Sequence, residues 1–198
     1  MAAKRRAETM EENRAKLIAA ARTAFAEKGF AAASMDELTA SVGLTRGALY
    51  HNFGDKKGLL AAVVAQVDGE MAQQAKAAAS GVSDPWEKLV AEGIAYIRMA
   101  MDAEVQRIVL RDGPAFLGDP SQWPSQNSCL EATRETITRL IDSGIMKPVN
   151  VDAAAHLLNS AALNAALWVA SSSEPEKTLP NMIDVFTQLA GGLRHRAI

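Results

Sequence analysis

The sequence predicts an all-α fold with about nine helices. Alanine is abundant and runs of β-branched residues are few, which favours helix over strand. Leu17, Ala21 and Phe25 share one helical stripe, and similar spacings recur along the chain. Capping residues, prolines and glycines bracket these stretches, and no convincing alternating pattern indicates a strand.

The N-terminal residues predict a small unit of three helices. The first helix is expected at about 8–28. A capping box of Ser34 and Glu37 starts a short second helix, which Gly43 ends. Thr45 is the N-cap of a third helix that begins directly after it. Two short helices joined by a tight, glycine-containing turn form a helix-turn-helix.

The rest of the chain predicts a larger helical part. Its helices are expected at about 56–79, 84–101, 103–111, 121–143, 151–172 and 176–195. Glycine and proline at 112–114 and again at 118–120 bracket a stretch that is expected to form a loop.

The composition is that of an ordinary globular protein, with 48% hydrophobic and 22% charged residues. No apolar stretch approaches the ~20 residues that span a bilayer. The basic N-terminus is not followed by the apolar region of a signal peptide. Cys129 is the only cysteine, which rules out an internal disulfide and fits a reducing compartment. We therefore expect a cytoplasmic protein.

Charge is distributed unevenly along the chain. Residues 1–60 hold ten basic and seven acidic side chains, whereas residues 61–198 hold eleven basic and sixteen acidic ones. A basic N-terminal unit on an acidic body indicates that the N-terminus meets a polyanion. Chance unevenness is the alternative that this count leaves open.

A longer motif covers residues 14–60. Its core is Gly-Ala-Leu-Tyr at 47–50, followed by Phe53 and Lys56, and the turn Val-Gly-Leu-Thr-Arg precedes it at 42–46. This segment resembles the DNA-binding domain of the TetR family of transcriptional regulators. The resemblance implies an all-helical fold, with a helix-turn-helix DNA-binding domain at 1–55 and an effector-binding and dimerisation domain at 56–198.

The resemblance also implies which residues contact DNA. They are Ser34, Thr45, Arg46, Gly47, Ala48, Tyr50, His51, Asn52 and Lys56. The N-terminal end of a recognition helix enters the major groove, so Arg46 is placed to pair with a guanine. In the family, a residue with a hydroxyl group is usual at the position of Met35, so the contact expected there with the DNA backbone is less well supported. Lys4, Arg5 and Arg6 form either a minor-groove arm or a disordered tail.

Catalytic signatures are missing from the larger part. The histidines lack the spacing of a metal site, Cys129 has no base nearby in the sequence, and no glycine-rich phosphate loop follows a strand. We expect a protein that is not an enzyme and that holds no metal and no cofactor.

Large apolar and polar side chains on the middle helices are candidates for an effector pocket, which is usually apolar with a few polar anchors. The expected lining residues are Trp86, Tyr96, Met99, Phe116, Trp123, Asn127, His156, Asn164 and Trp168, with Asn159 as a further polar anchor. Ordinary core packing accounts for each residue taken singly. The resemblance favours a pocket for the set.

The last two predicted helices carry wide apolar stripes, and small residues on the first of them allow close packing. The resemblance implies that these helices from two subunits form a four-helix homodimer interface. The alternative is that they close the core of a monomer.

The expected function is sequence-specific transcriptional regulation, with a repressor leaving a palindromic operator when it binds a small-molecule effector. A helical carrier or enzyme with an incidental helix-turn-helix is the alternative from another class. A sequence-indifferent DNA binder and an activator are further alternatives.

Overall fold

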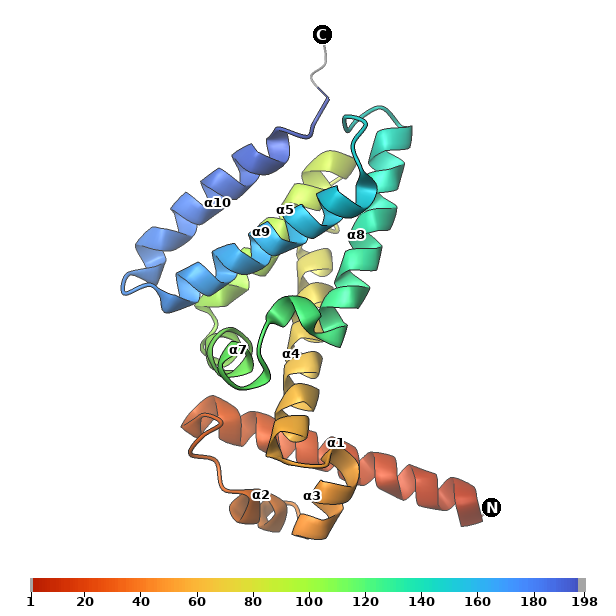
Figure 1. Ribbon diagram of the computed structural model, residues 1–198, viewed down its shortest axis with the longest axis vertical. Coiled ribbons are helices and arrows are strands. Elements are labelled where there is room, and N and C mark those ends of the chain that lie inside the picture. The colour runs from red at the N-terminus through yellow and green to blue at the C-terminus, as the bar shows by residue number, and fades with distance from the viewer. Residues whose placement is uncertain (1, 196–198) are drawn as a thin grey trace.

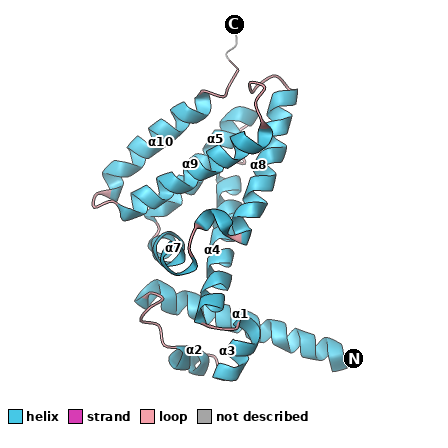
Figure 2. Cartoon of the chain, in the orientation of Figure 1, coloured by secondary structure: helices cyan, strands magenta, loops and turns pink. Residues whose placement is uncertain are grey.

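The computed structural model describes the backbone of residues 2–195 and the side chains of residues 8–195. Within this part of the chain every regular element is a helix, apart from a single bridge between Met146 and Arg194. Figures 1 and 2 show a small N-terminal group of helices at one end and a larger bundle at the other. The predicted all-α class is confirmed.

Three helices form the N-terminal unit: α1 (Ala2–Lys28), α2 (Met35–Ser41) and α3 (Arg46–Phe53). Helix α1 starts earlier than expected, because the helical backbone extends through the basic N-terminal residues. Phe25 and Leu49 are almost completely buried between the three helices. Their burial fixes the face that α3 turns inward.

Both short helices begin at the predicted caps. The Ser34 hydroxyl accepts a hydrogen bond from the Glu37 amide at 3.4 Å. The Thr45 hydroxyl accepts one from the Ala48 amide at 3.2 Å. Each cap satisfies an amide that the first helical turn leaves unpaired.

Helix α4 (Lys56–Ala78) joins the N-terminal unit to the body. The chain turns sharply from α3 into α4, and this turn depends on Gly58. A Cβ added at Gly58 would lie 1.9 Å from the Phe53 carbonyl oxygen, a distance that no side chain tolerates. Leu59 and Val63 then follow as fully buried core residues. The packing of α3 on α4 is therefore set where α4 begins.

Four further long helices build the body: α5 (Pro85–Arg98), α8 (Pro124–Asp142), α9 (Val151–Ser171) and α10 (Pro175–Gly191). Helix α9 packs against α5, α8 and α10. Figure 1 shows α9 and α10 side by side on one flank of the body.

A run of short helices connects α5 to α8. It comprises η1 (Met99–Met101), α6 (Ala103–Val105), η2 (Gln106–Asp112), α7 (Gly113–Leu117) and η3 (Pro120–Gln122). A loop is expected over 112–120, but residues 113–117 form α7, so this prediction is wrong there. Pro114 is tolerated because it lies in the first turn of the helix, where an amide hydrogen has no partner within the helix. Segment η2 is a π-helix, a form that frequently marks functional sites.

Among the described residues, α9 is the one helix with the length and composition to cross a membrane, with a mean hydropathy of 1.2 over 18 residues. The expectation that no apolar stretch is long enough to span a bilayer is therefore wrong for α9. Ala155 and Ala166 of α9 are fully buried against neighbouring helices. An alanine-rich helix in the core of a helical bundle has this same composition.

Replacement of Gly58 by alanine tests the α3–α4 turn. We expect Gly58→Ala to lower the free energy of unfolding by about 1–3 kcal/mol or to displace α3, because backbone must move. Gly69→Ala is the matched control in the same helix, since nothing lies within 4 Å of its added Cβ. The control should raise stability by up to about 1 kcal/mol. Thermal unfolding followed by circular dichroism measures the stability of both variants. Equal shifts in melting temperature for Gly58→Ala and Gly69→Ala would contradict the role assigned to Gly58 in the turn.

Candidate functional site

One face of α3 is open to solvent, while Leu49 on the opposite face is buried. The exposed positions are Arg46, Gly47, Tyr50 and His51, which follow helical spacing. Tyr50 is 48% exposed, which is unusual for an aromatic side chain of the core. Most of the residues predicted to contact DNA therefore share one accessible surface with the N-cap Thr45.

Arg46, the first residue of α3, reaches across to α2. Its Nε lies 3.3 Å from the Asp36 carboxylate, and both side chains are exposed. An exposed ion pair of this kind adds little to stability. The pair instead holds the guanidinium at the outer edge of the turn between α2 and α3.

Gly47 has no role in the internal packing of the protein. A Cβ added there would meet only the Thr45 hydroxyl, at an ordinary distance of 3.6 Å. Glycine at a helical position costs about 0.5–1 kcal/mol relative to alanine. Close approach of another molecule to this face of α3 would account for a glycine here.

Two other predicted contact residues are engaged within the protein. The Asn52 side-chain amide donates to the Ala48 carbonyl at 2.8 Å. The Lys56 ammonium donates to the Ala31 carbonyl at 3.3 Å and lies 4.6 Å from the centre of the Phe30 ring. Burial lowers the pKa of Lys56 from its ordinary value. Lys56 thus ties the start of α4 to the turn after α1, and its phosphate contact stays a prediction.

Of the other predicted contacts, Ala48 is half-buried in α3 and Ser34 lies at the start of α2. Ser34 is partly exposed at the α2 cap, where its hydroxyl is already an acceptor for a backbone amide. The side chains of Lys4, Arg5 and Arg6 lie outside the described residues, so the basic arm stays a prediction.

The turn after α1 docks on the π-helix η2. The Phe30 amide donates to the Asp112 carboxylate at 2.7 Å, and the Arg107 guanidinium donates to the Lys28 carbonyl at 3.3 Å. Gly29 adopts φ +79°, and a Cβ added to it would lie 2.6 Å from the Arg107 guanidinium. Glycine is required there for both reasons. We call these contacts the α1–η2 junction.

Neighbouring contacts extend this junction to α4 and α9. Arg22 of α1 donates to Glu104 and to Glu70, each at 2.8 Å. The hydrogen bond to Glu104 is the main cause that raises the pKa of Arg22. On its other side η2 is held by Arg111, which donates to the Ala170 carbonyl at 2.9 Å, near the end of α9. The segment therefore contacts both the N-terminal unit and the flank formed by α9.

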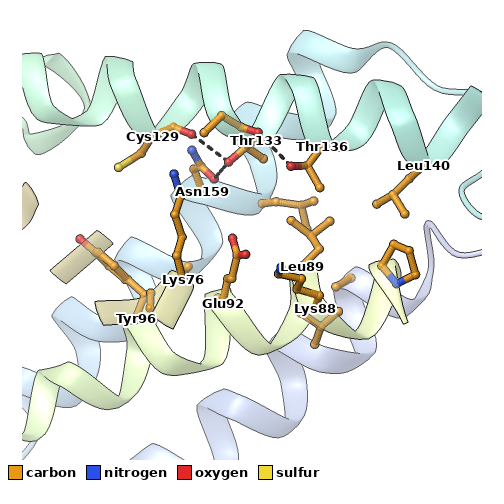
Figure 3. Close-up of a pocket in the computed structure, with 18 of the residues that line it drawn as sticks. Lys76, Lys88, Leu89, Glu92, Tyr96, Cys129, Thr133, Thr136, Leu140 and Asn159 are labelled. Atoms are coloured by element: carbon orange, nitrogen blue, oxygen red, sulfur yellow. Dashed lines mark hydrogen bonds between the residues drawn. The ribbon is translucent and has the colours of Figure 1, made fainter. Parts of the chain in front are cut away.

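A cavity of about 760 Å³ lies between α4, α5, α8, α9 and α10 and opens to solvent, with Lys76, Glu135 and Arg139 exposed at its border. Figure 3 shows side chains from α5 and α8 facing each other across it. Its apolar wall includes Leu89, Leu140, Leu158, Ala162 and Phe186. A cavity of this size and composition is typical of a site for one small organic molecule.

Asn159 and Thr133 supply uncharged polar groups in this cavity. The Thr133 hydroxyl lies 3.0 Å from Asn159 Oδ1 and 2.9 Å from the Cys129 carbonyl. The other amide atom, Asn159 Nδ2, is buried and has no hydrogen-bond partner. A buried donor without a partner costs about 1–3 kcal/mol, so an acceptor from a ligand would be favourable here.

A buried carboxylate stands behind one end of the cavity. Asp68 is fully buried and accepts hydrogen bonds from the Tyr96 hydroxyl at 3.2 Å and the Gln126 amide at 3.0 Å. Burial, with the Asp68 charge as a second cause, raises the pKa of Tyr96 well above its ordinary value. The Tyr96 hydroxyl therefore stays protonated and keeps its donor role toward Asp68.

Five charged side chains border the cavity: Lys76, Lys88, Glu92, Glu135 and Arg139. Burial raises the pKa of Glu92, although the three basic side chains oppose this shift. Burial also raises the pKa of the Cys129 thiol, so the thiol is a poor nucleophile at neutral pH. Charge at the border is thus mixed, with a small basic excess.

The structure separates the residues that were expected to line one pocket. Tyr96 and the additional anchor Asn159 line the cavity. Trp86 is buried in the core beside it, while Met99, Phe116 and Trp123 pack in the core that the body shares with the N-terminal unit. Asn127, His156, Asn164 and Trp168 are exposed on the outer faces of α8 and α9.

About a third of the cavity residues that the sequence did not predict lie on α8. Cys129, Thr133, Thr136 and Leu140 line the cavity and recur at three- and four-residue spacing. The small polar residues Cys129, Thr133 and Thr136, continued by Leu140 on the same face of an amphipathic helix, are the signal that could have identified them. Lys76 and Glu92, from α4 and α5, carry no comparable signal.

Large apolar side chains remain exposed on α9 and α10. Their exposed fractions are 71% for Leu157, 65% for Trp168, 51% for Val185 and 64% for Leu189. Neighbouring exposed apolar residues of this size mark an interaction surface. We call this surface the α9–α10 face.

Two family models match the chain. The model described as bacterial regulatory proteins, tetR family, matches residues 17–63. The model described as a tetracyclin repressor-like C-terminal domain matches residues 86–193. Together they cover the helix-turn-helix and residues 86–193 of the body, whereas residues 64–85, which include most of α4, lie between the two matches.

Individual proteins are similar over most of the chain. The transcriptional repressor AcnR of Corynebacterium glutamicum is 29% identical over 136 residues, which are 68% of this chain and 69% of AcnR. A crystal structure of a TetR-family transcriptional regulator from Pectobacterium atrosepticum is 43% identical, with a TM-score of 0.87 over 96% of this chain and 98% of that chain. RolR in complex with resorcinol shares the fold, with 18% identity and a TM-score of 0.70 over 93% of this chain and 94% of RolR.

Replacement of Asp112 by alanine tests the α1–η2 junction. We expect Asp112→Ala to lower the free energy of unfolding by about 1–3 kcal/mol, because the Phe30 amide loses its acceptor. Asp142→Ala, at the exposed end of α8, is the control and should leave stability within about 0.5 kcal/mol. Urea unfolding measures both, and a loss in the control as large as that in Asp112→Ala would contradict the assignment.

Proposed function

The chain belongs to the TetR family of bacterial regulatory proteins, and we propose that it is a repressor that a small molecule releases from its operator. It is a DNA-binding transcriptional regulator. The observation that carries the proposal is the accessible face of α3, with Arg46 and Gly47 at its N-terminal end. The N-terminal end of a recognition helix is the part that reads base edges in the major groove. A cytoplasmic location follows from this role.

The repressor acts as a homodimer through the α9–α10 face. The exposed apolar residues of that face would be covered by the same surface of a second copy, as a two-fold interface requires. Two recognition helices then enter successive major grooves, with half-site centres about 34–36 Å or slightly more apart. The operator is accordingly a palindrome.

The effector binds in the cavity and changes the spacing of the two recognition helices. Helix α4 carries Lys76 at the cavity and Gly58 at the turn into α3, so it spans both sites. The α1–η2 junction supplies a second connection between the body and the N-terminal unit. Release follows if the effector binds more tightly to the conformation with the wrong spacing, and the size of the effect equals that difference in affinity.

Binding to the DNA that flanks the gene tests the proposed function. We expect the purified protein to prefer this fragment over unrelated DNA of equal length, at fixed salt, by about a thousandfold or more. Equal, weak binding to both fragments would exclude autoregulation. Failure to bind any DNA would favour a carrier that uses the cavity alone.

Replacement of Arg46 by alanine tests base recognition. We expect Arg46→Ala to weaken operator binding by about 1–3 kcal/mol and to relax the preference at one base pair of each half-site. Asp36→Ala is the matched variant that removes the ion-pair partner but keeps Arg46. Fluorescence anisotropy on operator variants measures the effect. An equal loss on scrambled DNA would instead make Arg46 a phosphate contact.

Replacement of Gly47 by alanine tests close approach to DNA. Gly47→Ala should raise the free energy of unfolding by up to about 1 kcal/mol, because helix propensity improves and the added Cβ has room. The same variant should weaken operator binding, since the new methyl group faces the groove. Gly69→Ala in α4 should gain similar stability and bind operator normally. Unchanged operator affinity in Gly47→Ala would remove this position from the interface.

A further inference from the structure

The chemistry of the cavity identifies a class of effector, an inference that rests on the proposed role of the cavity as the effector site. We propose that the cavity binds an amphipathic monocarboxylate, with its carboxylate at Asn159 and Lys76 and its apolar body along Leu89 and Leu140. Three features of the cavity favour this class: a buried donor without a partner, the distribution of charge around it, and the apolar wall.

Asn159 presents a hydrogen-bond donor to the ligand. Its Oδ1 is occupied by the Thr133 hydroxyl at 3.0 Å, which orients the amide. Its Nδ2 is buried and unpaired, and Figure 3 shows this nitrogen between α8 and the Lys76 side chain. A carboxylate oxygen that displaces the atoms covering Nδ2 would receive a hydrogen bond that the protein itself does not supply.

Lys76 brings a positive charge to the same end of the cavity. Lys76 lines the cavity from α4, together with Glu92 of α5 and Cys129 of α8. Figure 3 shows the Lys76 side chain pointing toward Asn159, with Glu92 beside it. An amide donor together with an ammonium is a pair that favours an anion over a neutral or cationic head group.

The rest of the cavity favours an apolar body with a single charge. Its wall away from Asn159 includes Leu89, Leu140, Leu158 and Phe186. A second carboxylate placed against these apolar side chains would lose its hydration without gaining a partner there, whereas Lys88 and Arg139 at the border could pair with one. A monocarboxylate with an aromatic or alkyl body therefore fits the apolar wall better than an acid whose further carboxylates lie away from that border.

Matched probes test the class of head group directly. The probes are 4-phenylbutyrate, 4-phenylbutan-1-ol and 4-phenylbutylamine, which share one skeleton and carry an acid, an alcohol and an amine. Isothermal titration calorimetry of the full chain at pH 7 should show the acid binding at least tenfold more tightly than the alcohol, with the amine weakest. Equal or tighter binding of the alcohol, tightest binding of the amine, or no binding of any probe would overturn the proposal.

Variants separate head-group recognition from general effects on the cavity. Lys76→Gln and Asn159→Asp should weaken binding of the acid about tenfold and change binding of the alcohol little. Glu92→Gln should strengthen binding of the acid severalfold, because it removes a competing negative charge. Lys177→Gln, at the exposed start of α10, is the control and should bind all probes normally. Variants that lose acid and alcohol alike would also contradict the assignment.

The effect of the probes on operator binding distinguishes this proposal from the proposed function. Acid binding in the cavity without release of DNA would support the ligand class and contradict effector release. Release of DNA by the alcohol or the amine, but not by the acid, would support effector release and contradict the ligand class. Release by the acid alone, lost in Lys76→Gln, would support both.

Discussion

The α1–η2 junction is the contact on which the relation between the two parts of the molecule depends. Two side chains of η2 bind the backbone at the end of α1 and just after it: the Asp112 carboxylate accepts a hydrogen bond from the Phe30 amide, and the Arg107 guanidinium donates one to the Lys28 carbonyl. Gly29 is needed for the guanidinium to fit. Arg107 and Asp112 both belong to the π-helix η2, whose hydrogen bonds run i→i+5, so a change in η2 would shift both groups together. The N-terminal unit cannot reorient without changing this junction.

Helix α4 adds a second constraint on how the N-terminal unit and the body are placed relative to each other. Its C-terminal part lines the cavity, and its N-terminal end directly follows α3, the recognition helix. A helix of 23 residues is about 35 Å long. In the proposed mechanism, a small rotation caused by a ligand near Lys76 would become a larger displacement where α4 starts. Two connections of different kinds, the junction and the helix, link the body to the N-terminal unit. The proposed coupling is reciprocal, so DNA would weaken ligand binding by the same factor.

The sequence was informative where the structural signals are local. The caps Ser34 and Thr45 depend on residues three positions away, and the glycine-bounded turn defines the helix-turn-helix without reference to the rest of the fold. The cavity depends on which face each helix turns inward. Asn159 lines the cavity and Trp168 faces solvent, although both belong to α9 and both are plausible pocket residues by type. The π-helix was also missed, because hydrophobic periodicity does not distinguish it from an α-helix over seven residues.

Selection of bound sequences from a pool of random double-stranded DNA tests the central claim most directly, because it requires no knowledge of the regulated gene. The account predicts enrichment of a palindrome whose half-sites are centred about one helical turn apart, since two copies of α3 must enter successive major grooves. The Arg46→Ala variant should enrich a palindrome that is degenerate at one position of each half-site. Enrichment of a single, non-palindromic half-site would contradict the dimer, and no enrichment at all would contradict sequence-specific regulation.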